Sequence, residues 1–344
     1  MEGAHPAILE RLLATNTMKS AGYGTDEFCE AAREKIRAAC GCPEAAVHFL
    51  VGGTQVNATV IDAILRPWQG VIAAETGHIS THEAGAIEFG GHKVLTLSQK
   101  LGKLSAGDIE KYCNTYYQDE NHEHMVAPGM VYISQPTEYG TLYSLTELTA
   151  IHEVCREFQM TLYVDGARLA YGLAALENDV TLRDLARLTD VFYIGGTKCG
   201  ALFGEAVVIP DPDRIPHFFS MIKQHGALLA KGRLLGIQFD TLFTDDLYLK
   251  IGKNAIDMAQ LLKEILADAG YQAAFSSGDF SASPTNQVFV ILEDSQMARL
   301  AKNVSFSFWE KYDENHSIIR LATSWATKEE ELRALENILI KEKK

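Results

Sequence analysis

Two charged side chains in the middle of the chain, an acid and an amine, each follow a short apolar run. Asp165 comes directly after the run at 162–164, and Lys198 follows the run at 191–194 after two glycines and a threonine. Runs of this length are typical of buried strands, and a polar, mostly helical segment at 177–188 joins them. Two strands and a helical crossover form a parallel unit, in which ligands gather at the carboxyl ends of the strands. We therefore expect Asp165 and Lys198 to face one crevice.

An acid and an amine in one crevice are suited to hold pyridoxal phosphate. The amine forms a Schiff base with the aldehyde of this cofactor, and the acid keeps the pyridine nitrogen protonated, so that the ring accepts electrons. The alternatives are a surface role for Lys198 and helix capping for Asp165. The place of Lys198 after an apolar strand argues for burial, which lysine avoids unless it is paired.

A glycine pair earlier in the chain offers a place for the phosphate of such a cofactor. An apolar strand is expected at 46–51 and a helix at about 56–65, and between them lie Gly52, Gly53, Thr54 and Gln55. Free N–H groups and the helix dipole bind anions at the N-terminus of a helix. Ordinary turns use the same residues, so the glycine pair gains its weight from the acid and the amine at the later strand ends.

The composition is that of a soluble globular protein of about two domains. The chain has 344 residues, of which 47% are hydrophobic and 22% charged, and a formal net charge of −14. This excess of acid disfavours nucleic acids and anionic membranes as partners. No apolar stretch approaches the ~18 residues of a membrane span, and residues 1–20 lack a signal-peptide core. Three Asn-x-Ser/Thr patterns, at Asn57, Asn303 and Asn315, therefore carry little weight, and we expect a cytoplasmic protein with six reduced cysteines.

The order of the expected elements places a large α/β domain before a smaller C-terminal α+β domain. Residues 1–22 form an arm and one helix, residues 23–244 the large domain with a mainly parallel sheet, and residues 245–344 the smaller domain. Strands that alternate with helices up to residue 244 are typical of α/β folds. A long amphipathic helix is expected at 247–269, and the pattern then changes to strands at 287–292 and 317–323 and a helix at 329–340.

Taken together, these residues resemble the threonine aldolases, within the β-eliminating lyases of the fold type I (aspartate-aminotransferase-like) pyridoxal-phosphate enzymes. The resemblance covers residues 23–325 and is carried by Asp165-Gly166-Ala167-Arg168-Leu169, Thr197-Lys198, Gly52-Gly53-Thr54-Gln55, His78 with Glu83-Ala84-Gly85 behind it, and Arg320. It implies an aldolase that cleaves 3-hydroxy amino acids such as L-threonine or L-allo-threonine to glycine and an aldehyde.

The resemblance also implies which residues do the chemistry. Lys198 would carry the cofactor, and Asp165 would pair with its pyridinium nitrogen. The β-hydroxyl proton must be removed as the Cα–Cβ bond breaks, and imidazole is a base matched to neutral pH. The candidates, acting directly or through water, are His78, which would stack on the cofactor ring, His82, and His124, near a second family histidine. His82 is favoured as a substrate contact or a packed histidine. His78 and His82 lack a third ligand and the order of a zinc motif, so no metal is expected.

Further implied roles concern binding and the neighbouring subunit. The family's active sites lie at a dimer interface and tetramers are common, so we expect a homo-oligomer. Gly53, Thr54 and Gln55 would bind the phosphate. Arg168 would bind the cofactor and the substrate carboxylate, and Arg320 would bind the same carboxylate. Arg233 and Tyr23 would contact the cofactor or substrate of a neighbouring subunit.

The chain departs from the family pattern after the strand that ends near Ser134. Where typical members carry Asn-Thr-His-Asn, this chain has Pro136-Thr137-Glu138-Tyr139, so that Glu138 replaces an imidazole and Pro136 an amide. The departure concerns substrate recognition and leaves two alternatives open. One is a pyridoxal-phosphate-dependent lyase that eliminates a β-substituent from cysteine- or serine-like amino acids. The other is a non-catalytic oligomeric protein that retains the fold.

Overall fold

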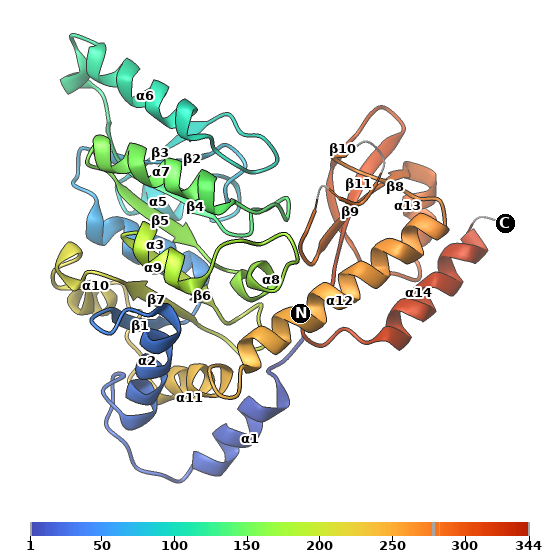
Figure 1. Ribbon diagram of the computed structural model, residues 1–344, viewed down its shortest axis with the longest axis horizontal. Coiled ribbons are helices and arrows are strands. Elements are labelled where there is room, and N and C mark those ends of the chain that lie inside the picture. The colour runs from blue at the N-terminus through green and yellow to red at the C-terminus, as the bar shows by residue number, and fades with distance from the viewer. Residues whose placement is uncertain (1, 277–278, 282, 343–344) are drawn as a thin grey trace.

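A seven-stranded sheet forms the centre of the larger part of the molecule (Figure 1). The computed structural model describes residues 2–276, 279–281 and 283–342. In spatial order the strands are β1 (Ala46–Leu50), β7 (Glu205–Ile209), β6 (Val191–Gly195), β5 (Thr161–Asp165), β4 (Ala127–Ser134), β2 (Gln69–Ala74) and β3 (Lys93–Leu97). Strand β7 is antiparallel to both its neighbours, whereas all pairs from β6 to β3 are parallel.

Helices cover both faces of this sheet, as parallel strands require. The strands are apolar on both faces, and every residue of β6 and β7 is buried. One face packs against α2 (Glu27–Cys40), α6 (Ala106–Gln118), α7 (Leu145–Glu157), α9 (Leu182–Leu188) and α11 (Arg233–Leu242). The other packs against α3 (Gly53–Ile64), α4 (His78–Thr81), α5 (Ala86–Phe89) and α10 (Phe218–Gln224).

A second, antiparallel sheet forms the smaller part of the molecule. Its order is β10 (Ser307–Lys311), β11 (His316–Ala322), β9 (Gln287–Glu293) and β8 (Gln272–Ala273). Three helices pack with it: α12 (Leu247–Asp268), α13 (Asp294–Leu300) and α14 (Glu329–Glu342). The expected α/β architecture with a smaller α+β part is thereby confirmed.

Helix α12 belongs to both parts and runs from one to the other (Figure 1). Near its start Tyr248 and Ile251 enter the core of the large sheet, and further along Leu262 and Ile265 enter the core of the small sheet. Gly252 lets α12 lie against the short helix α8 (Leu169–Leu173), because a Cβ at this position would overlap the carbonyl oxygen of Ala170. The position of the small sheet relative to the large one therefore depends on this contact.

Several element boundaries differ from the expected ones. The helical pattern over 218–241 corresponds to two helices, because α10 ends at Gln224, Gly226 follows with a left-handed backbone (φ 66°), and α11 begins only at Arg233. Helix α3 begins at Gly53 rather than near Val56, which brings the glycine pair to the helix N-terminus. The division at residues 22 and 244 stays a prediction, and its outermost residues, 1 and 343–344, lie outside the described residues. Within the described ranges, no helix combines the length and hydropathy needed to cross a membrane.

Candidate active site

The carboxyl ends of β5 and β6 lie next to each other, as the sequence predicts. Tyr163 pairs with Val191 in the parallel ladder. The turn after β5 lies so close to the end of β6 that a Cβ at Gly195 would overlap the carbonyl oxygen of Ala167. Glycine at this position therefore permits the approach that sets Lys198 within electrostatic range of Asp165.

Asp165 is buried and accepts four hydrogen bonds. Its Oδ1 accepts from the Tyr193 hydroxyl at 2.5 Å and from the Ala167 N–H at 3.0 Å. Its Oδ2 accepts from the Tyr132 hydroxyl at 2.6 Å and from the Asn57 amide at 3.3 Å. Burial, with the negative charge of Asp165, raises the pKa of both tyrosines, so that both stay protonated and donate. The carboxylate is thus fixed in place as an acceptor at the end of β5.

Lys198 is partly buried in the turn after β6. Burial, followed by the positive charge of Arg168, lowers the pKa of the Lys198 amine, against the opposing effect of Asp165 and Glu205. A lowered pKa favours the neutral amine, which is the form that attacks an aldehyde. Burial in turn raises the pKa of Glu205, whose Oε2 accepts from the Gly196 N–H at 2.8 Å.

His78 is tied to the same buried network by a carboxylate. It starts α4 after a three-residue turn at the end of β2, and its Nδ1 lies 2.7 Å from Glu83 Oε1. The Glu83 side chain is fully buried, and its Oε1 also accepts from the Asn57 amide at 2.6 Å. A carboxylate acceptor favours the tautomer with the proton on Nδ1 and leaves Nε2 available as a base.

Glu138, which stands where typical family members have histidine, lies beside His78. Its Oε1 accepts from the Ser134 hydroxyl at 2.7 Å and from the backbone N–H of His78 at 3.1 Å. The side chain is buried, and burial raises the pKa of the Glu138 carboxyl, with a smaller contribution from Asp165. The acid therefore holds the start of α4 against the end of β4.

The first turn of α3 has the features of an anion site. Gly52 is its N-cap, and no side chain caps the first N–H groups of the helix, so those of Gly53, Thr54 and Gln55 have no acceptor within the helix. A Cβ at Gly53 would lie 3.0 Å from the Tyr193 hydroxyl, which places this turn beside the Asp165 cluster. The Gln55 side chain is used locally, since its Oε1 accepts from the Val51 N–H at 3.3 Å.

Two arginines bring positive charge to the site. Arg320, on β11 of the small sheet, donates to Gln287 Oε1 at 3.0 Å, and its guanidinium lies 5.1 Å from the centre of the Trp309 ring. Burial and the charge of Arg168 lower the pKa of Arg320 to about 10. Within the part of the chain that the structure describes, neither arginine has an acidic partner. Two unpaired guanidinium groups in one crevice can bind a carboxylate.

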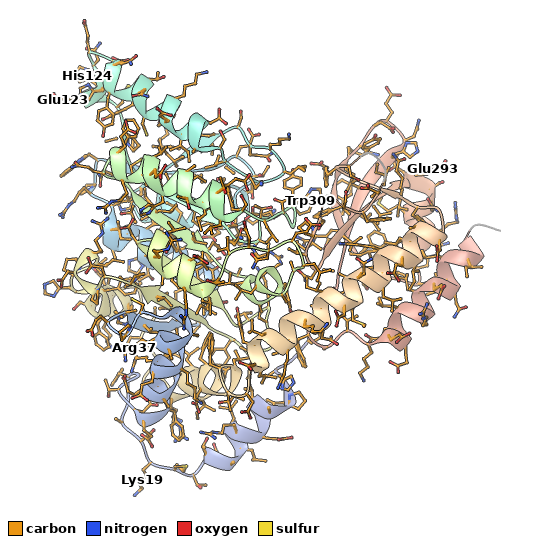
Figure 2. All side chains as sticks on the ribbon, viewed as in Figure 1. Lys19, Arg37, Glu123, His124, Glu293 and Trp309 are labelled. Atoms are coloured by element: carbon orange, nitrogen blue, oxygen red, sulfur yellow. The ribbon has the colours of Figure 1, made fainter. Side chains whose placement is uncertain are left out.

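The remaining sequence-predicted residues divide into one near the site and three away from it. His82 lies beside His78, with ring centroids 5.8 Å apart, and burial and the charges of His78 and Arg320 lower its pKa. His124 is exposed and lies ahead of β4, whereas Ser134 and the site lie at the other end of this strand, about 25 Å away. Figure 2 shows it beyond the far end of α6, away from Trp309.

Arg233 and Tyr23 are also directed away from their own chain's Lys198. Arg233 starts α11. Its guanidinium donates at 2.6 Å to the carbonyl oxygen of Thr15, the last residue of helix α1 (Pro6–Thr15), and at 2.6 Å to that of Met18, which follows the helix. Tyr23 is half-exposed, and the Lys223 amine lies 4.8 Å from the centre of its ring. A role for these residues or for His124 in catalysis needs a second copy of the chain.

Sequence reasoning missed the groups that hold the site from behind. They are Asn57, Tyr132, Tyr163, Tyr193 and Glu205, and Glu83 is noted only for its place behind His78. The one signal for Asn57 is its spacing of four residues from Gly53, which sets both on one side of α3. Within the described residues, no three His, Cys, Asp or Glu side chains gather as a metal site.

The fold is that of the fold type I, aspartate-aminotransferase-like enzymes. Aspartate aminotransferase from Thermus thermophilus superposes with a TM-score of 0.67 at 19% identity, over 99% of this chain and 89% of that one. The threonine aldolase of Leishmania major is far more similar, with a TM-score of 0.93 and 44% identity over 99% of this chain and 96% of that one.

The sequence comparisons define the family more narrowly. The model of the beta-eliminating lyase family matches residues 3–327. A low specificity L-threonine aldolase of Pseudomonas aeruginosa is 31% identical over 77% of this chain and 76% of that protein. Another, from a Pseudomonas species, is 30% identical over 91% and 87%. This chain belongs to the beta-eliminating lyase family and, within it, to the threonine aldolases; it is a carbon–carbon lyase, as its sequence predicts.

Proposed function

We propose that this protein is a pyridoxal-phosphate-dependent aldolase that cleaves L-threonine and L-allo-threonine to glycine and acetaldehyde. The observation that carries the proposal is the placement of Asp165 at the end of β5 and of Lys198 in the turn after the adjacent strand β6, with His78 tied to the hydrogen-bond network of Asp165. The low specificity named for the Pseudomonas relatives supports activity on both diastereomers.

The residues of the crevice fit this cofactor. Lys198 would hold its aldehyde carbon, Asp165 its pyridine nitrogen, and the first turn of α3 its phosphate. The space left by the missing side chain of Gly53, beside the Tyr193 hydroxyl, supports the phosphate assignment. When bound, pyridoxal phosphate supplies an electron sink for the electron pair of the broken Cα–Cβ bond.

The two arginines would orient the substrate. Bidentate contacts from Arg168 and Arg320 to its carboxylate fix the directions of the bonds at Cα. The Arg320 guanidinium is itself held by Gln287 and the Trp309 ring, so that little rotational freedom is lost when the carboxylate binds. Because Arg320 comes from the small sheet and Arg168 from the N-terminus of α8 in the larger part, the clamp would also join the two parts of the molecule.

His78 would accept the proton of the β-hydroxyl at Nε2, while Glu83 holds Nδ1. A general base of this kind typically contributes ~10²–10⁴-fold to the rate. His82 would contact the substrate on the same side. His124, Arg233 and Tyr23 would act on the site of a neighbouring copy, which makes the working unit at least a dimer, and we propose a tetramer. All six cysteines are free thiols, which supports a cytoplasmic location.

The test is an assay of acetaldehyde release from L-threonine and L-allo-threonine by the purified protein with pyridoxal phosphate. We expect release from both, and its loss to background in Lys198→Ala. Failure with threonine, allo-threonine and phenylserine alike would contradict the proposal. Because Glu138 stands where typical members have histidine, β-elimination is the second candidate. Release of pyruvate and ammonia without aldehyde would favour it.

A further inference from the structure

Asn57 lies at the centre of the buried network and touches both of its acids. It sits on α3, one turn after Gly53, and is completely buried. Its Asn-x-Thr pattern matches that of glycosylation sites, but a buried side chain cannot carry a glycan. A fully buried amide instead needs partners for its oxygen and for both of its amide hydrogens.

The orientation of the Asn57 amide follows from its partners. Its Oδ1 accepts from the Tyr163 hydroxyl at 2.6 Å, and burial raises the pKa of that phenol, so that Tyr163 is the donor. The nitrogen must then face the other way, toward two carboxylates. It lies 2.6 Å from Glu83 Oε1 and 3.3 Å from Asp165 Oδ2. Each of its two hydrogens is thus available to one acid.

The two acids have different tasks, and Asn57 is the group that joins them. Glu83 orients His78, and its second oxygen is buried without a partner among the described residues. Both hydrogen bonds of Glu83 therefore end on Oε1, one from His78 and one from Asn57. Loss of the Asn57 donor would leave the carboxylate held by His78 alone and less neutralised in a site of low dielectric.

We propose that Asn57 is a positioning residue for the aldol cleavage, whose amide couples the acid that orients His78 to the acid at the end of β5. This inference rests on the proposed function, because it takes His78 as the base and Asp165 as the partner of the cofactor. It adds a requirement that the proposed function does not contain, namely that the protonation of His78 and the environment of the cofactor respond together to a change at residue 57.

The first test is the pH dependence of kcat/KM for L-threonine in Asn57→Asp. A negative charge near His78 favours the imidazolium, so the acid limb of the profile is expected to move to higher pH. Glu83→Gln removes a negative charge and is expected to move the limb to lower pH. We expect kcat to fall about 10- to 100-fold in Asn57→Asp, as for a lost hydrogen bond to a charged group, with a smaller change in KM.

The second test does not depend on turnover. The visible absorption of the bound cofactor is titrated with pH in the holoenzyme, and the midpoint is expected to rise in Asn57→Asp because a further negative charge lies beside Asp165. Thr59→Val is the matched control, since Thr59 is buried on the same helix and its hydroxyl donates only to the Gln55 carbonyl. This control is expected to leave both the midpoint and the pH profile unchanged.

The outcomes separate the inference from the proposed function. Lower activity in Asn57→Asp with an unmoved limb and an unmoved midpoint would overturn the inference. A wild-type protein that binds the cofactor but releases no aldehyde would refute the aldolase, while a displaced midpoint would still support the coupling through Asn57. If Asn57→Asp fails to fold, Tyr163→Phe replaces it: the released amide is expected to move the limb upward by a smaller amount, and an unmoved limb would count against the inference.

Discussion

The side chain and the backbone of His78 are each tied to a buried acid. The imidazole is held by Glu83, and the N–H is held by Glu138. Asn57 donates to both Glu83 and Asp165 and so links the first acid to the end of β5. The Ser134 hydroxyl, which donates to Glu138, lies 3.5 Å from the Tyr132 hydroxyl. A base tied at both points keeps its ring in one orientation, which general-base catalysis needs.

Glu138→Gln tests, through stability, the buried acid that holds the His78 N–H. Burial raises the pKa of Glu138 above its ordinary value, so the folded protein binds its proton more tightly than the unfolded chain does. The wild type must then lose stability as pH rises from the ordinary glutamate pKa to the raised one. Glutamine still accepts both hydrogen bonds and lacks this dependence. We expect the Tm of the variant to gain on that of the wild type as the pH rises above the ordinary range of a glutamate carboxyl.

The control for this prediction is Glu120→Gln, which changes an exposed glutamate. Its Tm should follow that of the wild type across the same pH range. A Glu138→Gln variant whose Tm stays parallel to the wild type would mean that Glu138 is ionised at little cost, and that burial is offset by its two donors.

The sequence predicts the residues that would touch the cofactor better than the buried residues that support them. Lys198, Asp165 and His78 follow short apolar strands, and the carboxyl ends of parallel strands meet at one edge, so local pattern is enough to bring them together. Tyr132 and Tyr193 look like ordinary strand residues. Their hydroxyl partners are set by strand order and side-chain direction, which a single sequence does not specify.

At the scale of elements, the spacing of Arg168 and Arg320 depends on how closely α12 approaches α8. Arg168 is the N-cap residue of α8, and Arg320 is carried by the small sheet that α12 supports. The contact is set by Gly252, which has no room for a side chain. The sequence predicts α12 well because its apolar residues recur with helical spacing, but the contact across it is a tertiary feature.

Gly252→Ala is expected to separate the two helices. Overpacking of a close contact typically costs ~1–3 kcal/mol of unfolding free energy. Since the shift would also widen the carboxylate clamp, KM for L-threonine should rise more than kcat falls. Chemical denaturation and steady-state kinetics measure the two effects.

Gly107→Ala is the matched control, because a Cβ at that exposed position on α6 meets nothing within 4 Å. Alanine is the better helix former, so this variant should gain ~0.5–1 kcal/mol with unchanged kinetics. Equal stability of Gly252→Ala and the wild type would show that α12 can shift without cost.

Other elements lie outside the reach of sequence patterns for a physical reason. Strand β10 is half-exposed and irregular, with a register shift between Phe308 and Glu310, so it shows no clear alternation of apolar and polar residues. Strand β8 has only two residues. Both are held by pairing with the longer strands β11 and β9, which the sequence does predict.

At the scale of the whole molecule, one chain does not bring all the predicted residues to one site. His124, Arg233 and Tyr23 lie away from Lys198, and large apolar side chains are exposed on several elements, including Leu13 at 79% and Phe89 at 96%. Contact with a second copy would remove such side chains from water. Both observations are consistent with the proposed oligomer, in which a site takes residues from two copies.

Mixing two inactive variants tests whether His124 acts across a subunit interface. Lys198→Ala lacks the amine and His124→Ala lacks the imidazole, and each alone should lose at least about tenfold in kcat/KM. If His124 serves the neighbouring site, a hybrid dimer contains one complete site, and a random mixture should recover about a quarter of wild-type activity. Lys198→Ala with Asp165→Ala is the control, because both changes strike one chain's own cluster and no hybrid site is complete. A mixture with His124→Ala that is no more active than its two variants measured separately would exclude the cross-subunit role.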